Sequence, residues 1–307
     1  MRLSRILVAL ALLLVAGVGL FYFITIPKAA VTGTLPQRKA DLANGETMFN
    51  AGGCASCHAT PKQEDTRRLG GGLALNTPFG RFYVPNLSSD VDHGIGAWSE
   101  EAFVNAMLRG VGRNGEHLYP AFPYTSYQRM TLDDVRDLFA FLRSLPSDAT
   151  PSRPHELPFP FNVRRGLGLW KLLYLDGKMF VPEPSRSAAL NRGAYLVEGP
   201  SHCAECHSGR DVLGGIIPEQ RFAGGPDPEG KGFIPNITPG ENGIGAWSEK
   251  DIAYLLETGT TPDYDSVGSS MADVVINTGK LPAQDREAIA AYLKSLPPRA
   301  GKAPAKK

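Results

Sequence analysis

The sequence predicts an all-α protein in which one N-terminal transmembrane helix precedes two tandem helical domains. An apolar run without a charge fills residues 6–26, which predicts the first helix. A five-residue Cys- and His-containing motif occurs twice, 149 positions apart, within two longer similar segments. Segments with helix-capping residues at their ends surround both copies. The 307 residues suffice for about two domains of roughly 150 residues.

The N-terminal run is long enough to cross a bilayer. ILVALALLLVAGVGLFYFITI is longer than the apolar core of a signal peptide, which has about 7–15 residues. It ends at Pro27 without a small-residue cleavage site. We therefore expect residues 1–35 to form an uncleaved anchor and short linker, with a cleaved signal as the alternative. By the positive-inside rule, Arg2 and Arg5 stay in the cytoplasm and the rest of the chain faces the periplasm of a bacterial inner membrane.

The overall composition is ordinary for a folded protein. The net charge is +1, and no basic stripe marks the folded region, so we expect no nucleic-acid partner. The basic tail at residues 300–307 is expected to be frayed, with contact to a membrane surface as the alternative.

All four cysteines belong to C-x-x-C-H motifs, which are typical of covalent haem attachment. Two thiols on one helical turn add to the porphyrin vinyl groups, and the adjacent His becomes the proximal iron ligand. A redox dithiol, a zinc half-site and a structural disulfide are alternatives. The second copy, downstream of an export signal, favours haem. We expect two covalently bound haem c groups, attached through Cys54, Cys57, Cys203 and Cys206, with His58 and His207 on the irons.

The repeat extends over two whole domains. GIGAWSE begins at Gly94 and again at Gly243, at the same offset as the cysteines, and SLP closes both copies. The boundaries that follow are a first domain at 36–147, an inter-domain linker at 148–187, a second domain at 188–299 and the tail at 300–307.

Each domain has the same order of predicted helices. A helix precedes each motif, a middle helix begins after Ser99 or Ser248 as N-cap, and a last helix ends each domain. Gly/Pro-rich loops follow the motifs, where backbone can approach a porphyrin. This layout predicts two class I-like cytochrome c domains. Trp98 and Trp247 are expected as buried packing, with contact to the haem edges as the alternative. The last helices carry apolar stripes expected to pack on the first helices: Leu138, Phe141, Leu142, Leu145 and Ile289, Tyr292, Leu293, Leu296.

The sixth iron ligand is predicted to differ between the domains. Met271 lies between the middle and last helices of the second domain, so it is the expected distal ligand; a gap-filling core Met is the alternative. The repeat places Phe122 at the same point of the first domain, and its ring cannot ligate iron. Met130 or His117 would have to replace it, or the site is vacant. Met130 is also expected as a hydrophobic staple and His117 as a surface residue. We expect no role for His93, His155 and His202, in exposed-looking loops.

The linker at 148–187 has too many apolar residues for a flexible tether. We expect part of it to form a short helix packed across both domains, which would fix the distance between the haems. Contact with a partner or with the membrane surface is the alternative. The residues expected in this packing are Trp170, Leu172, Leu173, Tyr174 and Phe180.

Several longer segments together resemble one family. GCASCHA, LGGGLALNTPFGRFYVPN, HLYPAFPYTSY, FPFNVRRGLGLWKLLYL and NRGAYLVEGPSHCAECH resemble the membrane-bound cytochrome c subunits of periplasmic alcohol, gluconate and related dehydrogenases. The resemblance implies a partner dehydrogenase as electron donor and the quinone pool, a cytochrome or a terminal oxidase as acceptor. The alcohol-dehydrogenase subunits usually have three cytochrome domains and read YPAMPY at Phe122, so this chain departs from them in both respects.

Two functions follow from these features. In the first, the protein is an electron-transfer subunit without catalytic residues, because no G-x-G-x-x-G fingerprint follows a strand and substrate oxidation would belong to another subunit. In the second, it is a di-haem enzyme, a peroxidase or a sulfur-compound oxidase, acting at an open sixth position of haem 1. Glu116 and His117 would then be the acid–base pair. A sulfur oxidase with a Cys ligand is disfavoured because haem attachment uses all four cysteines.

Overall fold

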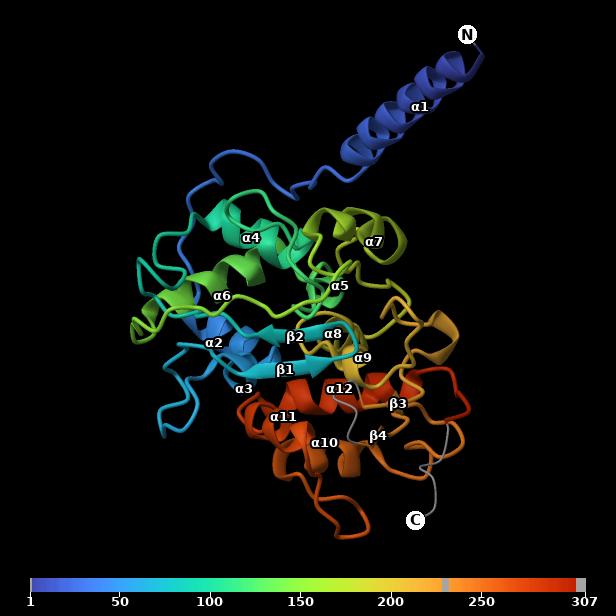
Figure 1. Cartoon of the computed structure of the whole chain (residues 1–307). Helices are drawn as coiled ribbons and strands as arrows, with labels where there is room; N and C mark the ends of the chain where they lie inside the picture. Colours follow the sequence, from blue (N-terminus) through green and yellow to red (C-terminus); the bar gives the residue numbers. More distant parts are fainter. Residues whose placement is uncertain (1, 228–231, 302–307) are drawn as a thin grey trace.

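A computed structural model describes residues 2–227 and 232–301 of the chain. One long helix, α1 (Arg2–Ile24), projects from one end of a helical body that contains all other described elements (Figure 1). Within α1, Leu3–Ile24 is apolar and long enough to cross a membrane, with a mean hydropathy of 2.7. Most of its side chains are exposed, and its last turn meets the body, where Arg165 lies against the Tyr22 ring.

The body has two halves with the same order of elements. The first half lies on the α1 side of the body and the second half lies beyond it (Figure 1). The first half comprises α2 (Leu42–Ala51), α3 (Cys54–His58), β1 (Ala74–Thr77), β2 (Gly80–Tyr83), α4 (Glu100–Arg109), α5 (Tyr124–Tyr127) and α6 (Leu132–Ser144). The second half comprises α8 (Ala188–Glu198), α9 (Cys203–Cys206), η2 (Pro218–Gln220), β3 (Gly225–Pro226), β4 (Phe233–Ile234), α10 (Glu249–Thr258), α11 (Ser270–Thr278) and α12 (Ala283–Ser295). The segment between them holds η1 (Arg164–Gly166) and α7 (Leu167–Tyr174).

The helix ends follow the predicted capping residues. The Ser99 hydroxyl accepts from the amide of Ala102 at the start of α4, at 3.1 Å. Ser248 and Asp251 form a reciprocal capping box on α10. Both helices end at a glycine in the left-handed conformation, Gly110 or Gly259. These contacts confirm the predicted middle helices.

The first and last helices of each half cross in direct backbone contact. A Cβ at Gly45 of α2 would lie 2.3 Å from the carbonyl oxygen of Asp137 in α6. A Cβ at Gly193 of α8 would lie 1.9 Å from the carbonyl oxygen of Ala288 in α12. Glycine is therefore required at both crossings. The predicted stripes of α6 and α12 are buried here, apart from Leu296, which is partly exposed.

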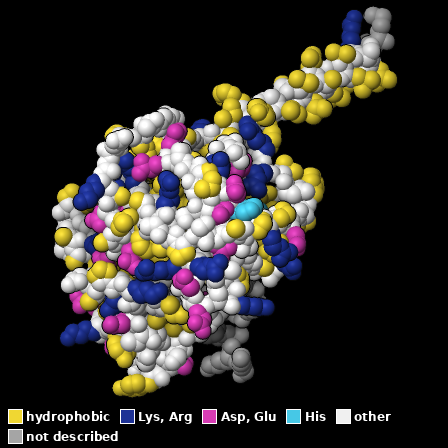
Figure 2. Space-filling view, turned by 90° about the vertical axis from the view of Figure 1, so that its left-hand side faces the viewer, with side chains coloured by type: hydrophobic (Ala, Val, Ile, Leu, Met, Phe, Trp, Pro, Cys, Tyr) yellow, Lys and Arg dark blue, Asp and Glu magenta, His cyan; other side chains and the backbone are white. Residues whose placement is uncertain are grey.

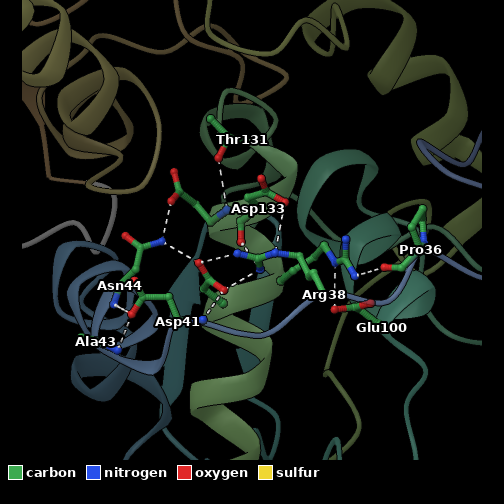
Figure 3. A network of polar contacts seen from close by, with 11 residues as sticks. Pro36, Arg38, Asp41, Ala43, Asn44, Glu100, Thr131 and Asp133 are labelled. Carbon is green, nitrogen blue, oxygen red and sulfur yellow. Dashed lines mark hydrogen bonds and ion pairs between the residues drawn. The ribbon is translucent and has the colours of Figure 1, made fainter.

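A polar network fastens the segment before α2 to α6 (Figure 3). The carboxylate of Asp137 accepts from both terminal nitrogens of Arg38, from the Asn44 side chain and from the Asp41 amide, at 2.5–3.2 Å. Burial alone would raise the pKa of Asp137, but these donors outweigh it and hold the pKa below its usual value. Asp137 is thus ionised and fully hydrogen-bonded inside the fold.

The fold is mostly helical, and the expectation of an all-α protein was wrong in one detail. β1 and β2 form an antiparallel hairpin, and β3 and β4 form a second, shorter pair. Thr77 closes the first turn, since its hydroxyl donates to the Gly80 carbonyl and accepts from the Phe79 amide. Arg81 then pairs through its backbone with Glu156 of the linker. The hairpin therefore depends on residues about 75 positions away, which local patterns do not reveal.

The linker packs on both halves, as predicted, but two of its leucines do not. The Trp170 ring meets that of Tyr124 edge-on at 6.2 Å, and its Nε1 donates to the Leu213 carbonyl at 2.9 Å. The Tyr174 hydroxyl donates to Asp211 at 2.7 Å, and Phe180 packs on Tyr195 at 5.6 Å. Leu172 and Leu173, expected in the same packing, are 58% and 66% exposed.

Candidate haem centres

The two C-x-x-C-H motifs form short helical turns at equivalent places in the two halves. α3 begins after Gly53 and α9 after His202, and both preceding residues have left-handed backbone. No disulfide joins the four cysteines within the part of the chain that the structure describes. In each motif the first cysteine is half-buried and the second is exposed, so both halves present the same donor set in the same setting.

Each motif histidine is oriented by a backbone carbonyl. Nδ1 of His58 lies 2.9 Å from the Pro85 carbonyl oxygen, and Nδ1 of His207 lies 2.8 Å from that of Pro235. A carbonyl can only accept, so Nδ1 carries the proton and Nε2 keeps its lone pair for a metal. Desolvation lowers the pKa of both imidazoles, against the opposing effect of these hydrogen bonds, and favours the neutral ligating form. The residues of both motifs therefore fit a covalently attached haem.

The residues predicted to distinguish the distal sides lie in equivalent elements. Met271 is in the first turn of α11, partly buried against the core. Phe122 lies just before α5, with its ring centre 5.4 Å from that of Tyr127 and 6.4 Å from that of Tyr124. α5 and α11 occupy the same place in the element order of their halves. Phe122 therefore lies before α5 and Met271 within α11, at similar points in the chain order of their halves.

The two residues considered as substitutes for Phe122 have other structural settings. Met130 is fully buried immediately before Thr131, the N-cap of α6, and Leu281 is buried in the same place before α12. Both positions suit hydrophobic staples. The prediction that His117 is a surface residue was wrong. His117 is buried, because the end of α1 covers it, and its Nε2 donates to the Thr25 carbonyl at 2.8 Å.

Two other histidines expected in exposed loops are held by contacts. Nε2 of His202 lies 3.1 Å from the Gly52 carbonyl oxygen, which belongs to the other half. His155 accepts at Nδ1 from the Tyr83 amide, at 3.1 Å, and packs edge-on against Phe82. His93 is exposed, as expected. Tertiary contacts distant in sequence partly bury the rings of His202 and His155.

The attachment turns contact the opposite half of the molecule in a reciprocal way. In α3, the Ser56 hydroxyl accepts from the Asn277 side chain of α11 at 2.8 Å. In α9, one carboxylate oxygen of Glu205 accepts from the hydroxyls of Thr125 and Ser126 of α5, both at 2.8 Å. Each turn is therefore bonded to the helix before the last helix of the other half. Sequence reasoning missed Ser56 and Glu205 because each occupies a variable position between the two cysteines of its own motif.

Glu205 keeps a negative charge at this interface. Its side chain is 12% exposed, and its second oxygen accepts from Arg210 at 2.7 Å. Burial alone would raise the pKa of Glu205, but Arg210 and the two hydroxyls outweigh it and lower the pKa. A fixed carboxylate thus lies between the cysteines of the second motif.

The sequence comparisons agree with this donor set. The family model for cytochrome c matches residues 42–146. A diheme cytochrome c-type protein of Cereibacter sphaeroides is 48% identical over 290 residues, which cover 94% of this chain and 96% of that protein. The chain belongs to the cytochrome c family. As a c-type cytochrome it carries covalently bound haem, and electron transport is its role.

Other relatives of this cytochrome are larger proteins. The fructose dehydrogenase cytochrome subunit of Gluconobacter japonicus is 37% identical over 85% of this chain and 54% of its own length. The gluconate 2-dehydrogenase cytochrome c subunit of Pantoea cypripedii is 34% identical over 82% of this chain and 58% of its own length. The cytochrome therefore spans slightly more than half the length of these dehydrogenase subunits.

Proposed function

We propose that this cytochrome is a membrane-anchored di-haem protein that carries electrons from a periplasmic dehydrogenase to the respiratory chain. The names of its relatives support the dehydrogenase as donor, and quinone, a cytochrome or a terminal oxidase would be the acceptor. Residues 36–147 and 188–299 would be the two cytochrome c domains, joined by 148–187.

The reciprocal contact of the attachment turns carries this proposal. Hydrogen bonds hold α3 to α11 and α9 to α5, so haems attached at the two turns would be kept at one separation. A fixed separation suits electron transfer, because its rate falls steeply with distance. The bond of Glu205 to buried Ser126 and the bond of Ser56 to buried Asn277 oppose sliding of one half over the other.

The roles of the ligating residues follow from their settings. Cys54, Cys57, Cys203 and Cys206 would bond the two porphyrins, and His58 and His207 would bind the irons through Nε2. The carbonyls of Pro85 and Pro235 fix the ring orientations. Met271 would be the distal ligand of the second haem, and a thioether there favours the ferrous state. Phe122 cannot supply that ligand, so the two centres would differ in potential.

No observation favours the di-haem enzyme. A carboxylate oxygen of Glu116 accepts from the Asn114 amide within its own loop, at 3.1 Å. His117 is buried against the end of α1 and bonded to Thr25. The two candidate acid–base residues are therefore engaged in holding the fold.

The anchor rests on α1. The apolar side chains before its last turn are exposed, which is the expected state of a segment surrounded by lipid. Arg2 and Arg5 at its start would remain on the cytoplasmic side.

The proposal is tested on the full chain purified in detergent. Haem quantification as the pyridine haemochrome should give two haems per chain, and Cys54→Ala/Cys57→Ala should lose one. A potentiometric titration should show two one-electron steps, and added peroxide should not be turned over. One haem per chain would contradict the di-haem assignment. Rapid turnover of peroxide would contradict the proposed electron-transfer role.

A further inference from the structure

The outer face of α7 has the reverse of the pattern expected for a surface helix. Leu169, Leu172 and Leu173 follow an i, i+3, i+4 spacing and thus share one side of the helix. They are 41%, 58% and 66% exposed, and Phe159 in the loop before α7 is 80% exposed. We call these four side chains the α7 face. A solvent-facing helix normally presents polar side chains here, so this face calls for an apolar neighbour.

Contacts on the inner side of α7 prevent the helix from rotating about its axis, so the leucines of the α7 face cannot pack against the body. A Cβ at Gly168 would lie 2.5 Å from Cβ of Thr25, at the end of α1. The Lys171 ammonium donates to the carbonyls of Arg109 and Gly110, which end α4, at 2.7 and 2.6 Å. The only cation of the helix is therefore buried while its leucines point outward.

The end of α1 is fastened to the start of α7. Arg165 donates to the Thr25 hydroxyl at 2.9 Å and to the Tyr22 carbonyl at 2.5 Å. Its guanidinium also lies 4.1 Å from the centre of the Tyr22 ring. His117 bonds the Thr25 carbonyl from the other side. These contacts hold α7 beside the last turn of the apolar helix.

The charge of this segment suits a lipid headgroup region. Residues 157–175 contain no Asp or Glu, and two of their basic residues, Arg164 and Arg165, are partly exposed, whereas Lys171 is buried. Tyr22, near the end of α1, is typical of the aromatic belt at a membrane–water boundary. Figure 2 shows hydrophobic side chains along α1 and, with Lys and Arg side chains, where α1 meets the body.

We propose that the α7 face lies in the surface of the same bilayer that α1 spans. The inference rests on the proposed anchoring by α1. It adds that the body is held against the membrane at a second point, so that its orientation to the bilayer is fixed. Attachment through both α1 and the α7 face suits an electron acceptor that is dissolved in the membrane. The same side of the body would then always face the lipid. Lipid is the expected neighbour because Gly168 and Arg165 hold this segment against the end of α1.

The test uses the full-length holoprotein in nanodiscs with a fluorescent bimane label at one added cysteine. Leu172→Cys reports on the α7 face, and Leu13→Cys reports on the middle of α1. Tyr264→Cys, in a loop between α10 and α11 at a site 92% exposed, is the matched water-facing control. Emission is compared between nanodiscs without spin label and nanodiscs whose lipid is spin-labelled near the headgroup, for positions 172 and 264, or in the middle of the acyl chain, for position 13, and this ratio cancels the constant quenching by haem. Haem content is checked for each variant.

The label at position 172 should lose about half its emission or more with the spin-labelled lipid, whereas the label at 264 should lose none. Quenching at 13 without quenching at 172 would overturn the inference, leave the anchor intact and assign this face to a protein partner. No quenching at 13 would contradict the anchor itself and the inference with it. A Leu169→Asp/Leu173→Asp pair should abolish the quenching at 172 while the quenching at 13 remains.

Discussion

Gly193→Ala should destabilise the second half of the cytochrome, although the substitution favours helix formation. The added methyl group would lie 1.9 Å from the Ala288 carbonyl oxygen and 2.9 Å from Cβ of Tyr292. A carbon–oxygen contact needs roughly 3.3 Å, so α8 and α12 must separate by about 1.4 Å. Overpacking of this kind costs about 1–3 kcal/mol, and more where backbone has to move. Alanine favours the helix by about 1 kcal/mol over glycine. Because backbone has to move, we take the upper end of the overpacking cost and expect a net loss of about 2 kcal/mol in the free energy of unfolding.

Guanidinium unfolding of the holoprotein in detergent measures this change, with far-UV circular dichroism and haem absorption as probes. Gly45→Ala should behave similarly in the first half, since its Cβ would lie 2.3 Å from the Asp137 carbonyl oxygen. Gly166→Ala is the control, because no atom lies within 4 Å of its added Cβ. If Gly193→Ala were as stable as the parent or more stable, the close crossing of α8 and α12 would be refuted.

Other substitutions test the buried charges and the distal residues. Asp137→Asn should lower the unfolding free energy at neutral pH. Since the pKa of Asp137 in the folded protein is depressed, the difference between the two proteins should shrink as the pH falls below about 4. A difference that does not depend on pH would contradict the network. Glu205→Gln removes a negative charge beside the second motif and should raise the potential of that haem by about 40 mV, on the order of 1 kcal/mol; an unchanged titration would exclude this influence. Met271→Ala should convert the second haem from low spin to high spin in the ferric absorption spectrum, and retention of its low-spin signal would remove Met271 as a ligand. Phe122→Met should raise the potential of the first haem, and no change would place its distal side elsewhere.

The sequence determined the features of this cytochrome that depend on short-range chemistry. The attachment motifs are complete within five residues. Ser99 and Ser248 find their partners within one turn, so both caps could be predicted. The internal repeat aligns Phe122 with Met271 in the sequence, and the two halves of the body keep a similar order of helices.

Tertiary structure alone decided the contacts between distant segments. Glu205 meets Thr125 across 80 positions, and His117 meets Thr25 across 92, so no local pattern marks either residue. Leu172 and Leu173 illustrate the same limit. Their apolar spacing predicted a packed helix but not which side would pack, since Gly168 and Lys171 take the inner side. A periodic pattern defines the faces of a helix, and only the neighbouring surfaces decide which face is covered.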